Sequence, residues 1–142
     1  MNCYKNSVKY EDRINDLNKK YASKGYPVVA INPNDAEKYP SDDYDGMVKR
    51  AIEKGFTFPY LQDETQNIAR NYGASRTPHV FILKKEKGDY IVKYVGAIDD
   101  NADEASAVKE KYVENAVDNL LTGKTVKLDF TKAIGCTIKW KK

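Results

Sequence analysis

The order of predicted elements along the 142 residues indicates a single α/β domain. The apolar run PVVAI at residues 27–31 is typical of a strand in a parallel sheet, covered on both faces. A helix follows it, and a later pair of strands is typical of a hairpin. A parallel strand, a crossover helix, a hairpin and a last helix imply an α/β sandwich. We expect one domain over residues 1–142, with an irregular tail over 124–142.

The first helix is predicted from about residue 4 to residue 23. Its apolar residues recur at helical spacing, and Gly25 stands where a helix commonly ends. Residues 32–35 after the strand are turn-forming. The apolar residues of this first helix are Tyr10, Ile14, Leu17 and Tyr21.

Two further helices are predicted, each ending at a glycine. Ser41 is a suitable N-cap for the first of them, and residues 58–61 after it are extended. Asp63 is expected to cap the second, over residues 64–72, with Ile68 and Tyr72 facing inward. The apolar stripe of the first comprises Tyr44, Met47, Val48, Ala51 and Ile52.

The second half of the chain begins with a strand over residues 77–84 that is led by proline. Residues 85–89 form a turn, and residues 90–95 alternate well enough to be the partner strand of a hairpin. The longest helix is predicted over residues 104–121, with its start favoured by acidic residues. Cys136, Ile138 and Trp140 alternate, which is compatible with a short final strand.

Composition excludes several classes of function. Apolar residues make up 41% and charged residues 32%, which fits a soluble globular protein. The longest apolar run is too short to span a bilayer, so no membrane segment is expected. A net charge of +3 is too small to indicate a nucleic-acid partner. Residues 1–10 show no secretory signal, so we expect a cytoplasmic protein, unless a signal precedes Met1.

The chain has two cysteines, Cys3 and Cys136, and one histidine, His79. These cannot form a disulfide-rich scaffold or a structural zinc site. The acidic loop at residues 99–104 lacks the spacing of a calcium-binding loop, and a solvated loop is the preferred interpretation. His79 is more typical of a hydrogen-bonded structural residue than of a general base.

Three features could carry chemistry, and each has a structural alternative. Thr77-Pro78 leads a strand, where the X–Pro bond is either an ordinary trans bond or a cis bond placed for a purpose. Cys3 lies just before the first helix, where free amides stabilise a thiolate, or it is a stray thiol near the terminus. Cys136 is either a distant resolving thiol or a small residue packed under the tail.

Seven sequence motifs carry a family resemblance. They are YEDRI at 10–14, GYPVVAINPND at 25–35, FPYLQDE at 58–64, YGA at 72–74, TPHV at 77–80, YVGAIDDN at 94–101 and GCTIKW at 135–140. These motifs closely resemble the thioredoxin-like redoxin family of the alkyl hydroperoxide reductase/thiol-specific antioxidant type. The resemblance covers essentially the whole chain and implies a thioredoxin-like three-layer sandwich.

The resemblance also implies roles for particular residues. Thr77 and Pro78 correspond to the family's Thr and cis-proline that lie beside the redox cysteine and shape the substrate groove, and Arg76 would supply positive potential to hold the thiolate. The sequence departs from the family at the first helix, because the positions of the family's cysteine and following proline fall on Tyr4 and Lys5. Cys3 is therefore one residue early.

A second departure is that the family's apolar strand just before the cysteine is missing, so the domain is expected to be N-terminally incomplete. The chain is then truncated, or another segment or chain supplies the strand, or its two neighbours close up. Unpaired strand edges would permit a homo-oligomer.

The expected function is a thiol–disulfide oxidoreductase or redoxin-type thiol reductase, with antioxidant activity implied by the family. Cys3 is the expected nucleophile, Arg76, Thr77 and Pro78 the substrate-binding residues, and Cys136 a candidate resolving thiol. The partners would be a protein disulfide or a peroxide, together with a thiol electron donor. This function needs neither a metal nor an organic cofactor. Peroxide is the weaker choice, because the Pro-x-x-x-Thr-x-x-Cys pattern of peroxiredoxins is absent. The alternative is a redox-inactive thioredoxin-like binding module or a truncated fragment.

Overall fold

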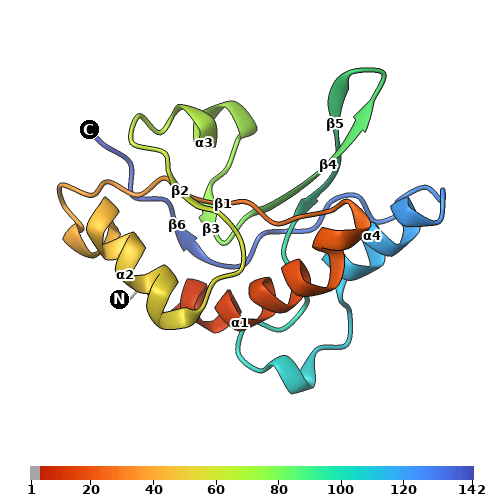
Figure 1. Cartoon of the computed structure of the whole chain (residues 1–142), viewed down its shortest axis with the longest axis horizontal. Coiled ribbons are helices and arrows are strands. Elements are labelled where there is room, and N and C mark those ends of the chain that lie inside the picture. The colour runs from red at the N-terminus through yellow and green to blue at the C-terminus, as the bar shows by residue number, and fades with distance from the viewer. Residues whose placement is uncertain (1–3) are drawn as a thin grey trace. The chain divides into compact units, whose positions relative to one another are not determined.

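The computed structural model describes the backbone of residues 4–142 and the side chains of residues 7–142 (Figure 1). The chain divides into two compact units. The first joins Arg76–Cys136 to the N-terminal residues up to Tyr10, and the second comprises Glu11–Ser75 and Thr137–Lys142. Helix α1, Tyr4–Tyr21, contributes residues to both units.

The second unit contains a parallel strand pair connected through a helix, as the apolar run at residues 27–31 predicted. Strand β1 pairs in parallel with β2, with Ile31 opposite Leu61. The remaining elements are one α-helical crossover, one further α-helix and two short 3₁₀ helices. In chain order the elements after α1 are η1 (Ala22–Lys24), β1 (Ala30–Asn32), η2 (Pro40–Asp42), α2 (Tyr44–Lys54), β2 (Tyr60–Gln62) and α3 (Asn67–Tyr72).

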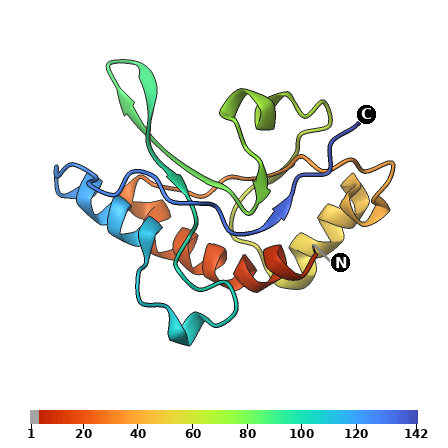
Figure 2. The same ribbon diagram turned by 180° about the vertical axis from the view of Figure 1, so that it is seen from behind.

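The first unit is built on the predicted hairpin. Strands β4 (Val80–Glu86) and β5 (Asp89–Gly96) pair antiparallel, with a register shift between Ile82 and Leu83. Helix α4 spans Tyr112–Leu121, and Figures 1 and 2 both show the extended segment after it running back alongside it. The short elements of this unit are β3 (Arg76–Thr77) and η3 (Ala105–Ala107). Strand β3 pairs with β6 (Cys136–Thr137), whose second residue is assigned to the second unit.

Residues 129–131 hold the returning segment against the outer edge of β5. Val95 donates its amide to Asp129 O at 2.9 Å and accepts from the amide of Thr131 at 3.0 Å. The buried Tyr94 hydroxyl donates to Ala97 O and lies 2.6 Å from Thr131 Oγ1. Burial raises the pKa of Tyr94, so this phenol stays a neutral donor. The segment is thus attached to the hairpin by both main-chain and side-chain bonds.

The expectation that residues 27–31 are covered on both faces is wrong. Val29 and Ile31 are 53% and 37% exposed, and Leu61, the partner of Ile31, is 48% exposed. These residues lie on one face of the β1–β2 pair, while Asn32 is buried on the other. An unbroken apolar run cannot distinguish a strand with one face exposed from a fully buried one.

The predicted cap of α2 is also wrong. Asp43 is the N-cap, and its carboxylate accepts the amide of Gly46 at 2.7 Å. Ser41 instead lies inside η2, because Pro40 starts a separate 3₁₀ turn there. Of the predicted stripe, Met47 is buried, whereas Tyr44 and Ile52 are 66% and 75% exposed.

Helix α3 is shorter than predicted and turns a different face inward. Ala69 is buried, while Ile68 and Tyr72 are each 43% exposed. Asp63 accepts the amide of Ala69 at 2.9 Å, so it does bond to the first turn, but the helix begins at Asn67. The buried Gln66, with a φ of 64°, delays the start.

The longest helix is α1, not the predicted helix at residues 104–121. Side chains in the acidic loop bond to nearby amides and so compete with helix formation. Asn101 Oδ1 accepts from the amides of Asp103 and Glu104, and Asp100 Oδ1 accepts from the amide of Lys109. Helix α4 therefore starts only at Tyr112.

Within the described residues, the strands form three two-stranded sheets, β1–β2, β3–β6 and β4–β5. Helix α1 begins at Tyr4, the first described residue, so the expected lack of a strand before it lies outside the described residues. The C-terminal residues supply the short strand β6, which pairs with β3.

Candidate functional site

The candidate site is centred on Thr77-Pro78, in the first unit. The peptide bond between these residues is cis, as the resemblance implied. The hydroxyl of Ser7, in α1, donates to Thr77 O at 3.3 Å. This bond places the first turns of α1 beside the residue that precedes Pro78.

Cys136 is a second neighbour of Thr77, in addition to Ser7. Thr77 Oγ1 donates to Cys136 O at 3.5 Å, a long bond that nevertheless fixes the two residues as neighbours. A Cβ atom built on Gly135 would lie 2.3 Å from Thr77 O and 3.1 Å from Pro78 N, so only glycine fits there. Cys136 is half-buried and, within the described residues, forms no disulfide.

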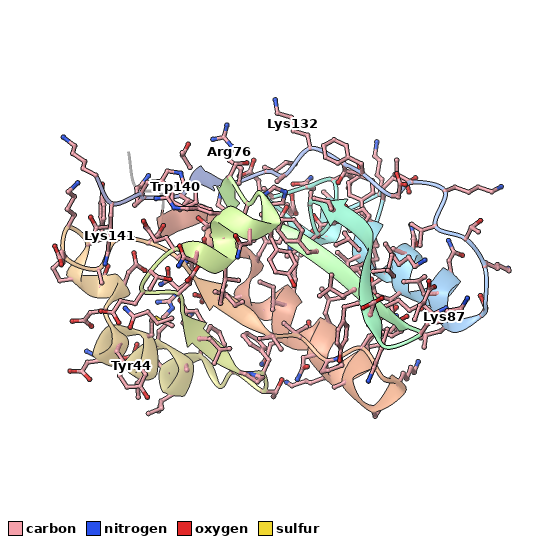
Figure 3. The ribbon with its side chains drawn as sticks, turned by 90° about the horizontal axis from the view of Figure 1, so that it is seen from above. Tyr44, Arg76, Lys87, Lys132, Trp140 and Lys141 are labelled. Atoms are coloured by element: carbon pink, nitrogen blue, oxygen red, sulfur yellow. The ribbon has the colours of Figure 1, made fainter. Side chains whose placement is uncertain are left out.

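Arg76 places positive charge next to this site. It directly precedes Thr77 in β3, and Figure 3 shows its side chain pointing away from the ribbon. This cation would favour a thiolate or an anionic substrate at the site over a neutral or cationic one.

The single histidine stands directly after Pro78. The His79 ring packs against Phe81 with 4.8 Å between the ring centroids. Burial lowers the pKa of His79, so the imidazole is predominantly neutral at neutral pH. A neutral ring packed on an aromatic neighbour fits the structural role that the sequence favoured.

Cys3, the predicted nucleophile, lies outside the described residues. The structure therefore brings together Thr77, Pro78 and Cys136 of the predicted site, with Arg76 adjoining. Sequence reasoning did not single out Ser7 or Gly135. Gly135 directly precedes Cys136 in the GCTIKW motif, and Ser7 stands four residues after Cys3 in the sequence. These sequence positions do not by themselves indicate that either residue contacts Thr77.

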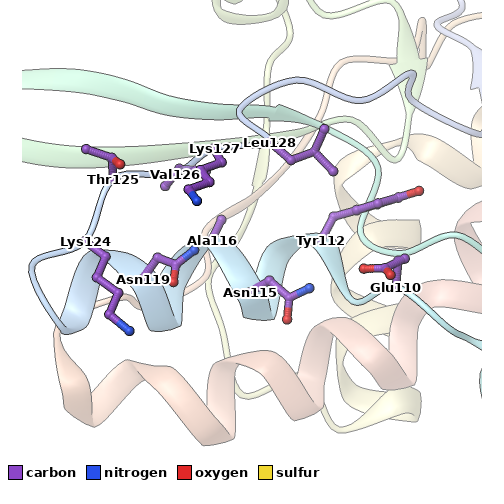
Figure 4. Close-up of a pocket in the computed structure, with 10 residues that line it drawn as sticks. All are labelled: Glu110, Tyr112, Asn115, Ala116, Asn119, Lys124, Thr125, Val126, Lys127 and Leu128. Carbon is purple, nitrogen blue, oxygen red and sulfur yellow. The ribbon is translucent and has the colours of Figure 1, made fainter.

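A groove of about 600 Å³ lies elsewhere in the first unit, between α4 and the returning segment (Figure 4). None of the sequence-predicted site residues lines it. Its walls carry one acidic residue, Glu110, two basic residues, Lys124 and Lys127, and uncharged polar residues that include Asn115 and Asn119.

The described residues contain no cluster of three or more His, Cys, Asp or Glu side chains able to hold a metal ion. A membrane-spanning helix is also absent from the described part, since no helix there is both long and apolar enough.

The Redoxin family model matches residues 3–113 of the chain. Two solved structures are similar over 96% of this chain. An uncharacterized conserved protein from Geobacillus kaustophilus is 38% identical with a TM-score of 0.87, and 71% of its chain is covered. A hypothetical protein from Sinorhizobium meliloti 1021 is 33% identical with a TM-score of 0.84, and 73% of its chain is covered. A search of curated proteins gave no match.

Proposed function

Because the chain belongs to the redoxin family and has the predicted thioredoxin-like α/β fold, we propose that it catalyses thiol–disulfide exchange through Cys3. The observation that carries the proposal is the hydrogen bond from Ser7 to Thr77 O. It supports a site in which the start of α1 meets the residue before Pro78. Cys3 stands four positions before Ser7 in the sequence, and the proposal places its thiol at this junction.

The proposed chemistry begins with the Cys3 thiolate. The free amides at the start of α1 favour the thiolate over the thiol, and Arg76 adds positive potential. The thiolate attacks one sulfur of a protein disulfide, whose S–S bond breaks as the Cys3–substrate bond forms. The leaving substrate sulfur departs as a thiolate and takes a proton from water. Thr77 and Pro78 line the groove in which the substrate chain lies.

Cys136 is proposed as the resolving thiol. Its position beside Thr77 supports this role, although it stands 133 residues after Cys3 by their sequence numbers (136 − 3). The Cys136 thiolate attacks Cys3 Sγ and expels the second substrate thiol. The product is a Cys3–Cys136 disulfide and a fully reduced substrate. An external thiol protein then supplies two electrons to reduce the enzyme again.

The test compares Cys3→Ser with the matched variant Cys136→Ser. We expect Cys3→Ser to abolish reduction of insulin disulfides. Cys136→Ser should retain attack and accumulate a mixed disulfide that mass spectrometry detects. In Cys136→Ser, the rate of Cys3 alkylation against pH should report a pKa clearly below the free value of about 8.5.

The second candidate function is a redox-inactive binding module, favoured by Tyr4 and Lys5 at the positions of the family's cysteine and proline. A Cys3 thiol that titrates near about 8.5, together with no insulin reduction, would exclude the exchange reaction and favour this alternative. Peroxide in place of insulin tests the weaker substrate: attack would convert Cys3 to a sulfenic acid and release an alcohol or water.

A further inference from the structure

Residues 138–142, here the C-terminal segment, lie on the second unit and are held mainly through their backbone. The amide of Ile138 donates to Ser75 O at 3.2 Å. The amide of Lys139 donates to Asn34 Oδ1 at 3.0 Å. Lys139 O in turn accepts from the amide of Asp35 at 2.9 Å. The amide and the carbonyl of Lys139 are therefore both hydrogen-bonded, and neither bond depends on the identity of the side chain at this position.

Gln66 adds two more bonds to the backbone of the same segment. Its Nε2 donates to Lys139 O at 2.9 Å, and its Oε1 accepts from the amide of Lys141 at 2.9 Å. Nε2 also donates to Pro33 O at 2.7 Å, which fixes the orientation of the side-chain amide. Gln66 is 1% exposed, so the amide is held in place like a peptide group of a neighbouring strand.

Two side chains of the segment provide the specific contacts. Ile138 is 2% exposed and is the apolar anchor. The guanidinium of Arg70 lies over the Trp140 ring, 4.7 Å from its centroid, in a cation–π contact. Figure 3 shows Trp140 and Lys141 following one another along this segment. Lys139 Nζ donates back to Thr137 O, so its side chain bonds within the tail.

Backbone hydrogen bonds that give affinity, combined with alternate side chains that give specificity, are how proteins bind extended peptides. We infer that the surface formed by Asn34, Asp35, Gln66 and Arg70 is a peptide-binding groove, which the chain fills with its own C-terminal segment. Its ligand is an extended peptide with a branched aliphatic residue, any residue and then an aromatic residue. This inference is independent of Cys3 and of the exchange reaction.

A tethered segment competes at an effective concentration of the order of millimolar, so binding of a free peptide is best measured after the tether is cut. A protease recognition sequence is inserted between Lys132 and Ala133 of the full chain, and the folded protein is cleaved. A fluorescent peptide with the sequence of residues 137–142, which contains no cysteine, is then added, and its anisotropy is followed. We expect saturable binding that displaces the cleaved segment, as detected by size-exclusion chromatography and mass spectrometry.

Peptide variants distinguish sequence-specific binding from nonspecific adsorption of the peptide. Replacement of the isoleucine by aspartate, or of the tryptophan by alanine, should weaken binding at least tenfold. Methylation of the lysine-139 backbone nitrogen should do the same, whereas replacement of that lysine side chain by alanine should leave binding within twofold. In the protein, Gln66→Ala should weaken binding at least tenfold.

Two results would overturn the inference. One is a cleaved protein that stays folded by circular dichroism but binds no peptide. The other is equal binding of a scrambled peptide. If cleavage unfolds the protein, added peptide must restore the fold, and failure to restore it also overturns the inference. On the uncleaved chain, a Trp-to-Phe peptide at millimolar concentration should shift the emission of Trp140, the single tryptophan.

Discussion

The hydroxyl of Ser7 donates a 3.3 Å hydrogen bond to the carbonyl oxygen of Thr77, a residue 70 positions further along the chain. This bond joins the first turns of α1 to the strand entry at Pro78. If the exchange reaction occurs at this junction, the bond sets the position of the nucleophile relative to the substrate groove.

Ser7→Ala should destabilise the protein by about 1 kcal/mol, because it leaves Thr77 O without this donor. It should also slow insulin reduction severalfold, since α1 is no longer held against Thr77. Urea denaturation and the insulin assay measure the two effects. Ser106→Ala is the control, because that hydroxyl bonds the exposed Glu104 carboxylate, and its effect should stay within about 0.5 kcal/mol.

Gly135→Ala should destabilise the protein by about 2 kcal/mol, since the added methyl group would meet the Thr77 backbone. The displaced backbone should also lower the exchange rate. Gly55→Ala serves for comparison: it has open space around it and a φ of 61°, so it should lose about 1 kcal/mol without changing the exchange rate. Unchanged stability in Gly135→Ala would contradict the close approach to Thr77.

Arg50 pairs with Glu11 through two parallel hydrogen bonds of 2.9 and 2.8 Å, with the two side chains 19% and 14% exposed. Arg50→Ala should cost about 2 kcal/mol in the free energy of unfolding, because it leaves a poorly solvated carboxylate. Lys49→Ala on the same helix breaks only an exposed pair at 4.0 Å and should cost less than about 0.5 kcal/mol. Equal effects in thermal unfolding would show that the Arg50 pair contributes nothing.

Tyr60 should remain protonated well above pH 10. Burial, with the Asp42 carboxylate as the second cause, raises the pKa of Tyr60 to about 12. The folded state then holds this proton more tightly than the unfolded state, so stability falls as pH rises from about 10 to about 12, by about 2 kcal/mol.

Ultraviolet difference titration of wild type against Tyr60→Phe isolates this phenol from the exposed tyrosines. The stability of Tyr60→Phe should fall less over the same pH interval. A Tyr60 transition near pH 10 would mean that the phenol is not buried as described.

Local sequence signals located most of the elements. Helical spacing of apolar residues found α1, and Gly25, Gly55 and Gly73 mark the ends of three helical segments. Alternation around the turn at Gly88 predicted the β4–β5 hairpin. These signals succeed because spacing and backbone freedom act within one or two turns of the chain.

Local signals failed where several polar residues compete for the same amides. Ser41 and Asp43 are both good caps, and the choice depended on where Pro40 starts a 3₁₀ turn. Likewise, Asp100 and Asn101 bind loop amides and delay α4, although their neighbours look like a helix start. Which faces of α2 and α3 are buried also depended on the elements packed beside them.

By itself the sequence determined the redoxin family and most of the succession of helices and strands. It also singled out Thr77-Pro78 as part of the candidate site. Only the tertiary structure brought Ser7 and Cys136 to Thr77, across separations of 70 and 59 residues, and closed Gln66 over the C-terminal segment. The physical reason is the sequence separation over which the interactions act. The spacing of apolar residues and the choice of turn residues depend on near neighbours in the chain, whereas these contacts form only when distant segments pack together.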